Sequence, residues 1–338
     1  MIVEMRTGAP KEEVTAVVDR AKSLSLKVQL NLGTDKTVVA LLGSNTGQID
    51  TDIFAVLPGV ESVTRIMKPY KLASREFKPK DTVVNIEGLE IGGKRIIVMA
   101  GPCAVESKEQ MVAAAKAIKE SGASVLRGGA FKPRTSPFAF QGLQEIGLDL
   151  LAEVREQFKI PIITEVVDQH DIITVSKSAD ILQVGSRNMQ NFALLTSIGR
   201  SRCACVLKRG FSCTVTEWLN AADYLLAEGN QKVILCERGI RTFEDSTRFS
   251  LDISSIPVIK RFSHLPVIVD PSHAAGHRSL VPAMAKAAIA AGADGLLIEV
   301  HPNPTEAMVD GLQSLDPEDF ARLMEELRPI AEAVGRSL

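Results

Sequence analysis

The residues between positions 126 and 138 combine types that rarely occur together in one loop. The segment reads LRGGAFKPRTSPF and holds three cations, Arg127, Lys132 and Arg134, beside two glycines and two prolines. Proline disfavours both a helix and a central strand here, so the cations lie on a stiff loop. Arginine suits bidentate capture of carboxylate or phosphate, and lysine acts as a point charge. The loop predicts contact with a small, multiply anionic substrate.

Three further cations, Arg187, Lys208 and Arg238, follow short apolar runs in the same way as Arg127. If these runs are parallel strands, their carboxyl ends meet at one edge, and the cations converge there. We therefore expect one strongly positive mouth on a chain whose formal net charge is only −2.

A second group of residues at the ends of these runs has the chemistry of metal ligands: Cys103, His273, Glu299 and His301, with Asp310 further along. Thiolate, imidazole and carboxylate together suit a divalent transition metal. Their separations match no linear metal motif, however. A buried apolar cysteine and a hydrogen-bonded histidine remain the alternatives for Cys103 and His273.

Eight short apolar runs position these residues, and each is followed by an amphipathic or helix-containing stretch. Near-continuous apolar runs indicate strands buried on both faces, as in a parallel sheet. Eight such units over about 240 residues predict a (β/α)₈ TIM barrel, with a doubly wound open sheet as the alternative. The runs are 95–101, 124–130, 161–167, 179–186, 204–210, 232–239, 266–273 and 295–302.

The first 67 residues follow another pattern. Strands are predicted at 1–5, 27–33, 36–43 and 60–67, with helices at 11–25 and 48–57. This βαββαβ order is the ferredoxin-like motif. We expect a small ferredoxin-like (ACT-like) domain over residues 1–67 and a polar linker over 68–82. The catalytic barrel is expected over 83–338, with a β-hairpin at its start.

Composition excludes several classes of function. The chain is 45% hydrophobic and 24% charged, and its near-zero net charge predicts neither a general nucleic-acid binder nor a membrane-surface binder. No signal-peptide pattern or membrane-length apolar run is legible. The five cysteines are odd in number and have no C-x-x-C spacing, which favours a reduced, cytoplasmic location.

Seven blocks of residues together resemble one family closely. The 3-deoxy-D-arabino-heptulosonate 7-phosphate (DAHP) synthases of type Iβ show the same blocks in the same order, and the likeness covers nearly all of residues 83–338. The blocks are AGPCAVES (100–107), LRGGAFKPRTSP (126–137), QVGSRNMQN (183–191), LKRG (207–210), LCERGIRT (235–242), VDPSH (269–273) and EVHPNP…DGLQSL (299–315).

The resemblance implies condensation of phosphoenolpyruvate with erythrose 4-phosphate at the first step of the shikimate pathway, with release of phosphate. It implies a divalent metal ion, Mn, Fe, Co or Zn, which acts as a Lewis acid. His301 is then left out of the ligand set. The implied metal ligands are Cys103, His273, Glu299 and Asp310.

The same resemblance assigns substrate contacts. Lys132, Lys208, Cys103 and His273 are expected to take part directly in the reaction, although the general acid and base stay open. The implied phosphoenolpyruvate clamp is Arg127, Lys132, Arg187, Lys208 and Arg238, and the erythrose 4-phosphate loop is Lys132, Pro133, Arg134 and Thr135.

Other readings stay open at this stage. A 3-deoxy-D-manno-octulosonate 8-phosphate synthase, which uses arabinose 5-phosphate, typically has K-A-N-R where this chain has K-P-R-T. A non-catalytic metabolite sensor is the alternative of another class. The family also suggests a homotetramer and an N-terminal domain for feedback inhibition by tyrosine or phenylalanine, or for assembly only. After VDPSH the chain has Ala274, Ala275 and His277, where relatives often have more glycine and an arginine.

Overall fold

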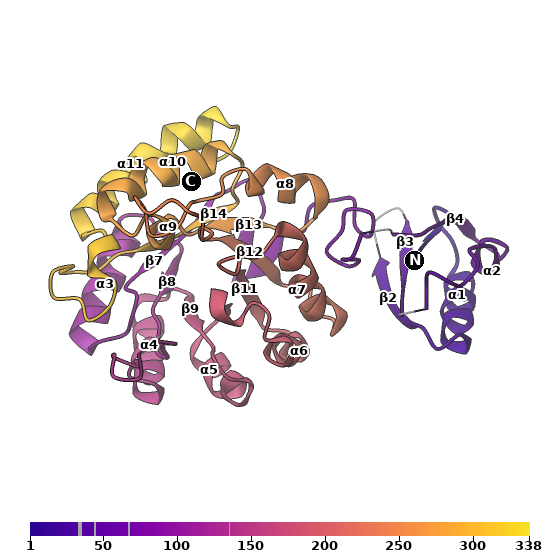
Figure 1. Ribbon diagram of the computed structural model, residues 1–338, viewed down its shortest axis with the longest axis horizontal. Helices are drawn as coiled ribbons and strands as arrows, with labels where there is room; N and C mark the ends of the chain where they lie inside the picture. The colour runs from indigo at the N-terminus through magenta and orange to yellow at the C-terminus, as the bar shows by residue number, and fades with distance from the viewer. Residues whose placement is uncertain (33–35, 44, 67, 135) are drawn as a thin grey trace. The chain divides into compact units, whose positions relative to one another are not determined.

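The computed structural model describes residues 1–32, 36–43, 45–66, 68–134 and 136–338. The chain divides into two compact units, and Figure 1 labels most of their helices and strands. The first comprises Met1–Asp81 with Phe262–His264, and the second comprises Thr82–Arg261 with Leu265–Leu338. Within the described ranges, no helix has the length and apolar character needed to cross a membrane.

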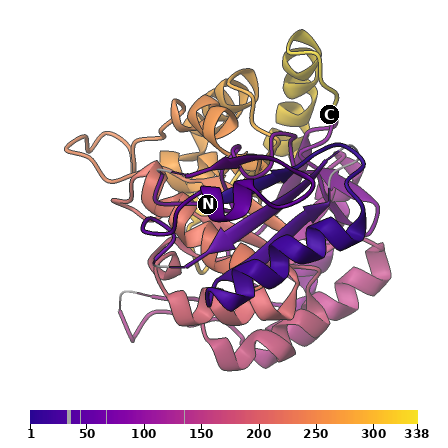
Figure 2. The ribbon, with the colours of Figure 1, turned by 90° about the vertical axis from the view of Figure 1, so that its right-hand side faces the viewer.

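The first unit has the predicted βαββαβ order. Its four-stranded antiparallel sheet has the order β2-β3-β1-β4, and Val3 and Val17 lie in its core. Figure 2 shows helix α1 running alongside the strands. The ferredoxin-like prediction is confirmed by these elements: β1 (Ile2–Met5), α1 (Lys11–Ser23), β2 (Lys27–Leu32), β3 (Thr37–Leu42), α2 (Asp52–Ala55) and β4 (Val60–Thr64).

Helix α2 is shorter than the predicted span of 48–57. The backbone amide of Gln48 donates to the carbonyl of Asn45 in a turn, and the side chain of Asp50 accepts from the amide of Asp52 at 3.1 Å. A backbone turn and the Asp50 side chain therefore compete with the helix at its start, and Pro58 follows its predicted end. One helical turn suffices to bury Phe54 completely.

The second unit is a closed barrel of eight parallel strands, as predicted. Pairing of Gly295 with Ile97 through Glu299 with Gly101 joins the last strand to the first, so the open-sheet alternative is excluded. Every strand residue is buried, which explains why the apolar runs are continuous. The strands are β7 (Ile97–Gly101), β8 (Val125–Arg127), β9 (Ile162–Glu165), β10 (Ile181–Val184), β11 (Ala204–Lys208), β12 (Val233–Glu237), β13 (Val267–Val269) and β14 (Gly295–Glu299).

Helices follow the strands, and local capping sets several of their starts. Ser107 accepts a hydrogen bond from the amide of Gln110, and Thr214 and Glu217 form a reciprocal capping box. The helices are α3 (Lys108–Glu120), α4 (Glu145–Phe158), α5 (Ile172–Ser178), α6 (Phe192–Ser201), α7 (Val215–Ala227), α8 (Ser255–Phe262), α9 (Pro271–Ala275), α10 (Val281–Ala290) and α11 (Pro317–Ala333). Short 3₁₀ turns are η1 (Gln169–Asp171), η2 (Ser186–Asn188), η3 (Arg278–Leu280) and η4 (Gly311–Gln313).

The predicted hairpin precedes the barrel. Strands β5 (Val84–Ile86) and β6 (Leu89–Ile91) pair antiparallel. Their apolar side chains share one buried cluster with residues near the amino ends of the barrel strands, including Ile97, Val125 and Ile181. The hairpin therefore closes the amino-terminal end of the barrel, which leaves the carboxyl end as the working face.

The segment predicted as a linker folds into local structure. Tyr70, Leu72, Ala73 and Phe77 are buried, and the Nε2 atom of His264 lies 2.7 Å from the carbonyl oxygen of Leu72. The segment up to Asp81 belongs to the first unit together with Phe262–His264.

Candidate active site

A pocket of about 330 Å³ lies at the carboxyl ends of the barrel strands. The cations predicted to converge do line it, and Pro133 lines it with them. Thr135 lies outside the described residues. Among the described lining residues, eight are cationic and only Glu165 and Asp310 are acidic; the cations are Arg127, Lys132, Arg134, Arg187, Lys208, Arg238, Arg241 and Arg248.

Two glycines let the loops of Cys103 and Lys132 approach each other. Gly101 ends β7 at φ +143°, and a Cβ atom there would collide with the carbonyl oxygen of Arg127. Gly129 donates its amide to the carbonyl of Cys103 at 3.1 Å, where a side chain would meet the same oxygen. Gly101 and Gly129 therefore permit close backbone contact between the two loops.

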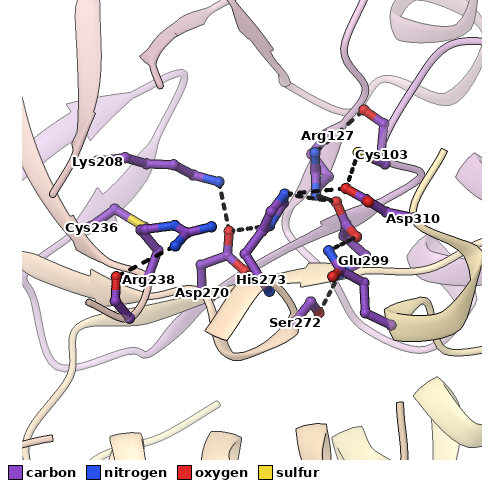
Figure 3. A network of polar contacts seen from close by, with 12 residues as sticks. Cys103, Arg127, Lys208, Cys236, Arg238, Asp270, Ser272, His273, Glu299 and Asp310 are labelled. Carbon is purple, nitrogen blue, oxygen red and sulfur yellow. Dashed lines mark hydrogen bonds and ion pairs between the residues drawn. The ribbon is translucent and has the colours of Figure 1, made fainter. Parts of the chain in front are cut away.

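Cys103, His273, Glu299 and Asp310 converge beside this pocket. One ligand atom from each lies within 4.8 Å of the others. The Sγ atom of Cys103 is 3.3 Å from Asp310 Oδ2, and His273 Nε2 is 3.4 Å from Glu299 Oε1, as Figure 3 shows. Atoms that bind one metal at about 2.0–2.3 Å lie roughly 3–4 Å apart, so the geometry and the donor types both fit a divalent cation.

Polar partners, two of them buried, orient three of these four side chains. Asp270 Oδ2 lies 2.8 Å from Nδ1 of His273, which leaves Nε2 turned toward the cluster (Figure 3). Gln313 donates to Glu299 at 2.6 Å, and Arg248 donates to Asp310 at 3.2 Å. Such outer partners fix the ring orientation and basicity of metal ligands.

The electrostatics favour cation binding at His273 and Glu299, whereas the Cys103 thiol must lose its proton when a cation binds. Burial, reinforced by Glu299, raises the pKa of the Cys103 thiol to about 12. Burial also lowers the pKa of His273 although Asp270 opposes this, so the imidazole is neutral and able to bind a metal. Burial works against ionisation of Glu299, yet His273 and Arg127 hold its pKa at about 2.

The two lysines that the sequence predicts to take part in the reaction lie against carboxylate and sulfur groups. Lys208 donates to Asp270 at 2.6 Å. Lys132 donates to the carbonyl of Cys103 at 2.9 Å and lies 3.2 Å from its Sγ atom. Arg127 pairs with Glu299 at 2.7 Å, so this cation joins the anion pocket to the ligand cluster.

Two polar residues at the strand ends lie outside the site. His301, which residue chemistry alone placed with the ligands, has its Nε2 atom 3.2 Å from Glu106 and lies outside the group of four. Arg209 is turned away from the pocket and pairs with Glu237 and Asp252, both at 2.8 Å. A strand end places successive side chains on opposite faces, so Lys208 and Arg209 cannot both face the barrel axis.

The structure also brings in residues that the sequence did not single out. Arg241 and Arg248 add two cations, and Phe211 and Phe249 form part of the wall. The Oγ atom of Ser186 lines the pocket and is buried without a hydrogen-bond partner among the described residues. Of these residues, only Arg241 and Arg248 had a signal in the sequence, because both are cations that follow the apolar run 232–239.

Fold and site define a (β/α)₈ enzyme for small, multiply anionic substrates, with a donor set for a divalent metal. Comparison with family models is specific on this point. Residues 76–333 match the DAHP synthetase I family, and residues 1–68 match the DAHP synthase ferredoxin-like domain. The chain belongs to the DAHP synthetase I family.

Individual relatives agree with this assignment. A phospho-2-dehydro-3-deoxyheptonate aldolase of Thermotoga maritima is 47% identical over 335 residues, or 99% of each chain. A crystal structure of the Thermotoga maritima DAHP synthase superposes with a TM-score of 0.79 at 46% identity, covering 99% of this chain and 98% of that one. A 2-dehydro-3-deoxyphosphooctonate aldolase of Geobacter sulfurreducens is 29% identical over 267 residues, 73% of this chain and 97% of its own.

Proposed function

We propose that the chain condenses phosphoenolpyruvate with erythrose 4-phosphate, forming 3-deoxy-D-arabino-heptulosonate 7-phosphate and releasing phosphate. This is the first step of the shikimate pathway to the aromatic amino acids. One observation carries the proposal: a thiol, an imidazole and two carboxylates meet beside a pocket lined by eight cations. Full-length identity of 47% to a phospho-2-dehydro-3-deoxyheptonate aldolase supports it.

The proposed metal ligands are Cys103, His273, Glu299 and Asp310, and the ion is Mn, Fe, Co or Zn. A bound divalent ion would supply Lewis-acid polarisation of the aldehyde oxygen of erythrose 4-phosphate. The mixed donor set accepts several metals, and availability selects among them.

In the proposed reaction, C3 of phosphoenolpyruvate bonds to the aldehyde carbon, water adds at C2, and the phosphate leaves from C2. Arg127, Lys132, Arg187, Lys208 and Arg238 would hold phosphoenolpyruvate, and their charge would stabilise the departing phosphate. Lys208 and Asp270, 2.6 Å apart and buried, form a pair in which a proton can be held or moved beside C2.

Lys132, Pro133, Arg134 and Thr135 would hold erythrose 4-phosphate. The position of Lys132 Nζ beside the Cys103 sulfur supports a second task for it. There it would donate a proton to the aldehyde oxygen as the new carbon–carbon bond forms.

A release assay tests the function and its rivals together. The purified chain is mixed with Mn²⁺ and phosphoenolpyruvate, and phosphate is measured with erythrose 4-phosphate or arabinose 5-phosphate as the second substrate. We expect rapid release with erythrose 4-phosphate only. Faster release with arabinose 5-phosphate would favour the octulosonate reaction, and none with either sugar would favour a sensing barrel.

We further propose that residues 1–67 form a feedback switch for tyrosine or phenylalanine, and that the chain assembles as a homotetramer in the cytoplasm. All proposed catalytic groups belong to the barrel, so the extra domain serves another purpose. The five cysteines are free, which supports a reducing compartment. A role in assembly alone is the competing interpretation for the domain.

A further inference from the structure

Two phenylalanines in the wall of the pocket form a stacked pair. Phe211 follows β11 and Phe249 belongs to the loop between β12 and α8; their ring centroids lie 5.1 Å apart at an interplanar angle of 8°. Backbone hydrogen bonds anchor both residues, because Phe249 donates to the carbonyl of Ala274 at 2.9 Å and Phe211 accepts from Arg241 at 2.6 Å. Two separate loops thus present a fixed aromatic surface to the pocket.

Three arginines of the pocket lie over these rings. The guanidinium carbon of Arg238 is 4.0 Å from the Phe249 centroid and 4.9 Å from the Phe211 centroid. Those of Arg187 and Arg241 lie 5.4 and 5.7 Å from the Phe211 centroid. These distances fall within the range of cation–π attraction, for which about 6 Å is the limit.

The surroundings of Arg238 show why aromatic rings suit this wall of the pocket. It is buried and donates to the carbonyl of Gly239, and in the described chain no carboxylate lies at ion-pair distance from it. Burial lowers its pKa to about 10. Arg209, its neighbour in the adjacent strand end, has two carboxylates instead.

A carboxylate would neutralise the guanidinium and compete with an incoming anion. An aromatic face attracts the cation through its quadrupole and leaves the charge and the N–H donors available. Three guanidinium groups held close together also repel one another when no anion is bound, and the rings offset part of this repulsion.

We propose that Phe211 and Phe249 are positioning residues, which hold Arg187, Arg238 and Arg241 ready for the phosphate group of phosphoenolpyruvate. The inference rests on the proposed function for the identity of the anion. The aromatic pair acts through the arginines and touches no reacting atom.

The test replaces each ring with an apolar side chain of similar size. Binding of inorganic phosphate and of phosphoenolpyruvate to the full chain is measured by calorimetry, and kcat and both KM values are measured in parallel. Phe249→Leu and Phe211→Leu should weaken both ligands by roughly 5- to 30-fold and raise the KM for phosphoenolpyruvate alike. The KM for erythrose 4-phosphate and kcat should change far less.

Two comparisons isolate the ring face. Phe249→Tyr keeps the π system and should restore affinity to near the unaltered level. Phe243→Leu changes a fully exposed phenylalanine of the same loop and should have no effect on binding. Circular dichroism and melting confirm that each variant is folded.

Unchanged phosphate and phosphoenolpyruvate affinity in both leucine variants would overturn the proposal. The proposal would also fail if Phe249→Tyr bound phosphate as weakly as Phe249→Leu does, or if the leucine variants lost only kcat. Either result would indicate that the rings serve general packing. Calorimetry with phosphate needs no turnover. An unaltered chain that is inactive with both sugars would therefore refute the proposed function separately.

Discussion

Cys103 contributes most distinctively to the proposed metal site, because it is the only sulfur among the four donors. Its Sγ atom is buried, 3.3 Å from Asp310 and 3.2 Å from Lys132. Since burial raises the pKa of the thiol, a divalent cation and the nearby lysine are what would stabilise the thiolate. The residue is therefore a sensitive point at which to test for metal.

Removal of this sulfur should abolish both metal binding and turnover. We expect Cys103→Ala to lose stoichiometric Mn²⁺ or Zn²⁺, as measured by elemental analysis after gel filtration. Prolonged EDTA treatment of the unaltered chain should abolish activity, and added Mn²⁺ should restore it. Cys203→Ala, which removes a partly exposed thiol, is the control. Full activity in demonstrably metal-free protein would contradict the site.

Arg134 should serve the second substrate more than the first. A charge-assisted contact of about 1.5–3 kcal/mol implies that Arg134→Ala raises the KM for erythrose 4-phosphate by roughly 10- to 150-fold. Steady-state kinetics with each substrate varied in turn measures this, and Arg322→Ala, an exposed arginine of α11, serves as control. A rise confined to phosphoenolpyruvate would show that the loop is wrongly assigned.

His264 should make the stability of the fold sensitive to acid. Burial lowers its pKa to about 4, below the 6.5 of a free histidine. Between these values the unfolded chain binds a proton that the folded chain excludes, so stability falls as pH drops from about 6.5 to 4, by about 3 kcal/mol in total. Melting at pH 7 and pH 5 should show a larger loss for the unaltered chain than for His264→Gln. Equal losses of melting temperature in the two proteins would show that His264 is not the source of the acid sensitivity.

At the scale of elements, two loops that carry proposed metal ligands are tied together by one side chain. Glu106, after β7, accepts from the amide of Met308 at 2.9 Å and lies 3.2 Å from the His301 ring, both in the segment after β14. Cys103 precedes this tie and Asp310 follows it. The contact therefore sets how closely the two ligands approach.

Loss of this tie should loosen metal binding without removing a ligand. We expect Glu106→Ala to weaken Mn²⁺ affinity by about 10- to 100-fold in calorimetry, the range typical of outer-shell partners. Glu109→Ala alters an exposed carboxylate three residues along and should leave affinity unchanged. The tie has no such role if both variants bind metal as tightly as the unaltered chain.

Helices, strands and site residues could be predicted where neighbouring residues determine them, and could not where contacts between distant segments do. The barrel strands were legible because burial on both faces leaves continuous apolar runs, whereas α2 was overextended because turns at Gln48 and Asp50 outweigh helix pattern. The four metal ligands could be predicted because the seven sequence blocks occur in the same order as in the family that they resemble. Asp270, Glu106 and the two stacked phenylalanines were not assigned roles. Lys208, His301 and the facing ring are their distant partners, and only the folded barrel brings these groups together.

At the scale of the whole molecule, the division into two units bears on the proposed feedback switch. A solved structure of a truncated form of the Thermotoga maritima DAHP synthase covers 79% of this chain with a TM-score of 0.74. A shortened form of that relative thus exists as a folded protein. Inhibition by an amino acid would require different affinities for two arrangements of the chain, since equal affinity shifts nothing.

Truncation should separate catalysis from inhibition. A chain that starts near Lys80 should stay active and ignore added tyrosine or phenylalanine, while the full chain is inhibited. Phosphate release over a range of amino acid concentrations measures both. If the full chain shows no response to either amino acid at about millimolar concentration, the domain serves assembly instead.

The pairing of β14 with β7 also governs how the chain can be made. The first sheet is complete once β4 has left the ribosome, but the barrel keeps unpaired strand edges until β14 arrives. Cys103 and Asp310, 207 residues apart, meet only then. Until that point the apolar interior, including Ile97 and Met99, stays open to solvent and to other nascent chains. A chain whose translation stops before β14 should therefore aggregate or bind chaperones, and it should have no partial activity.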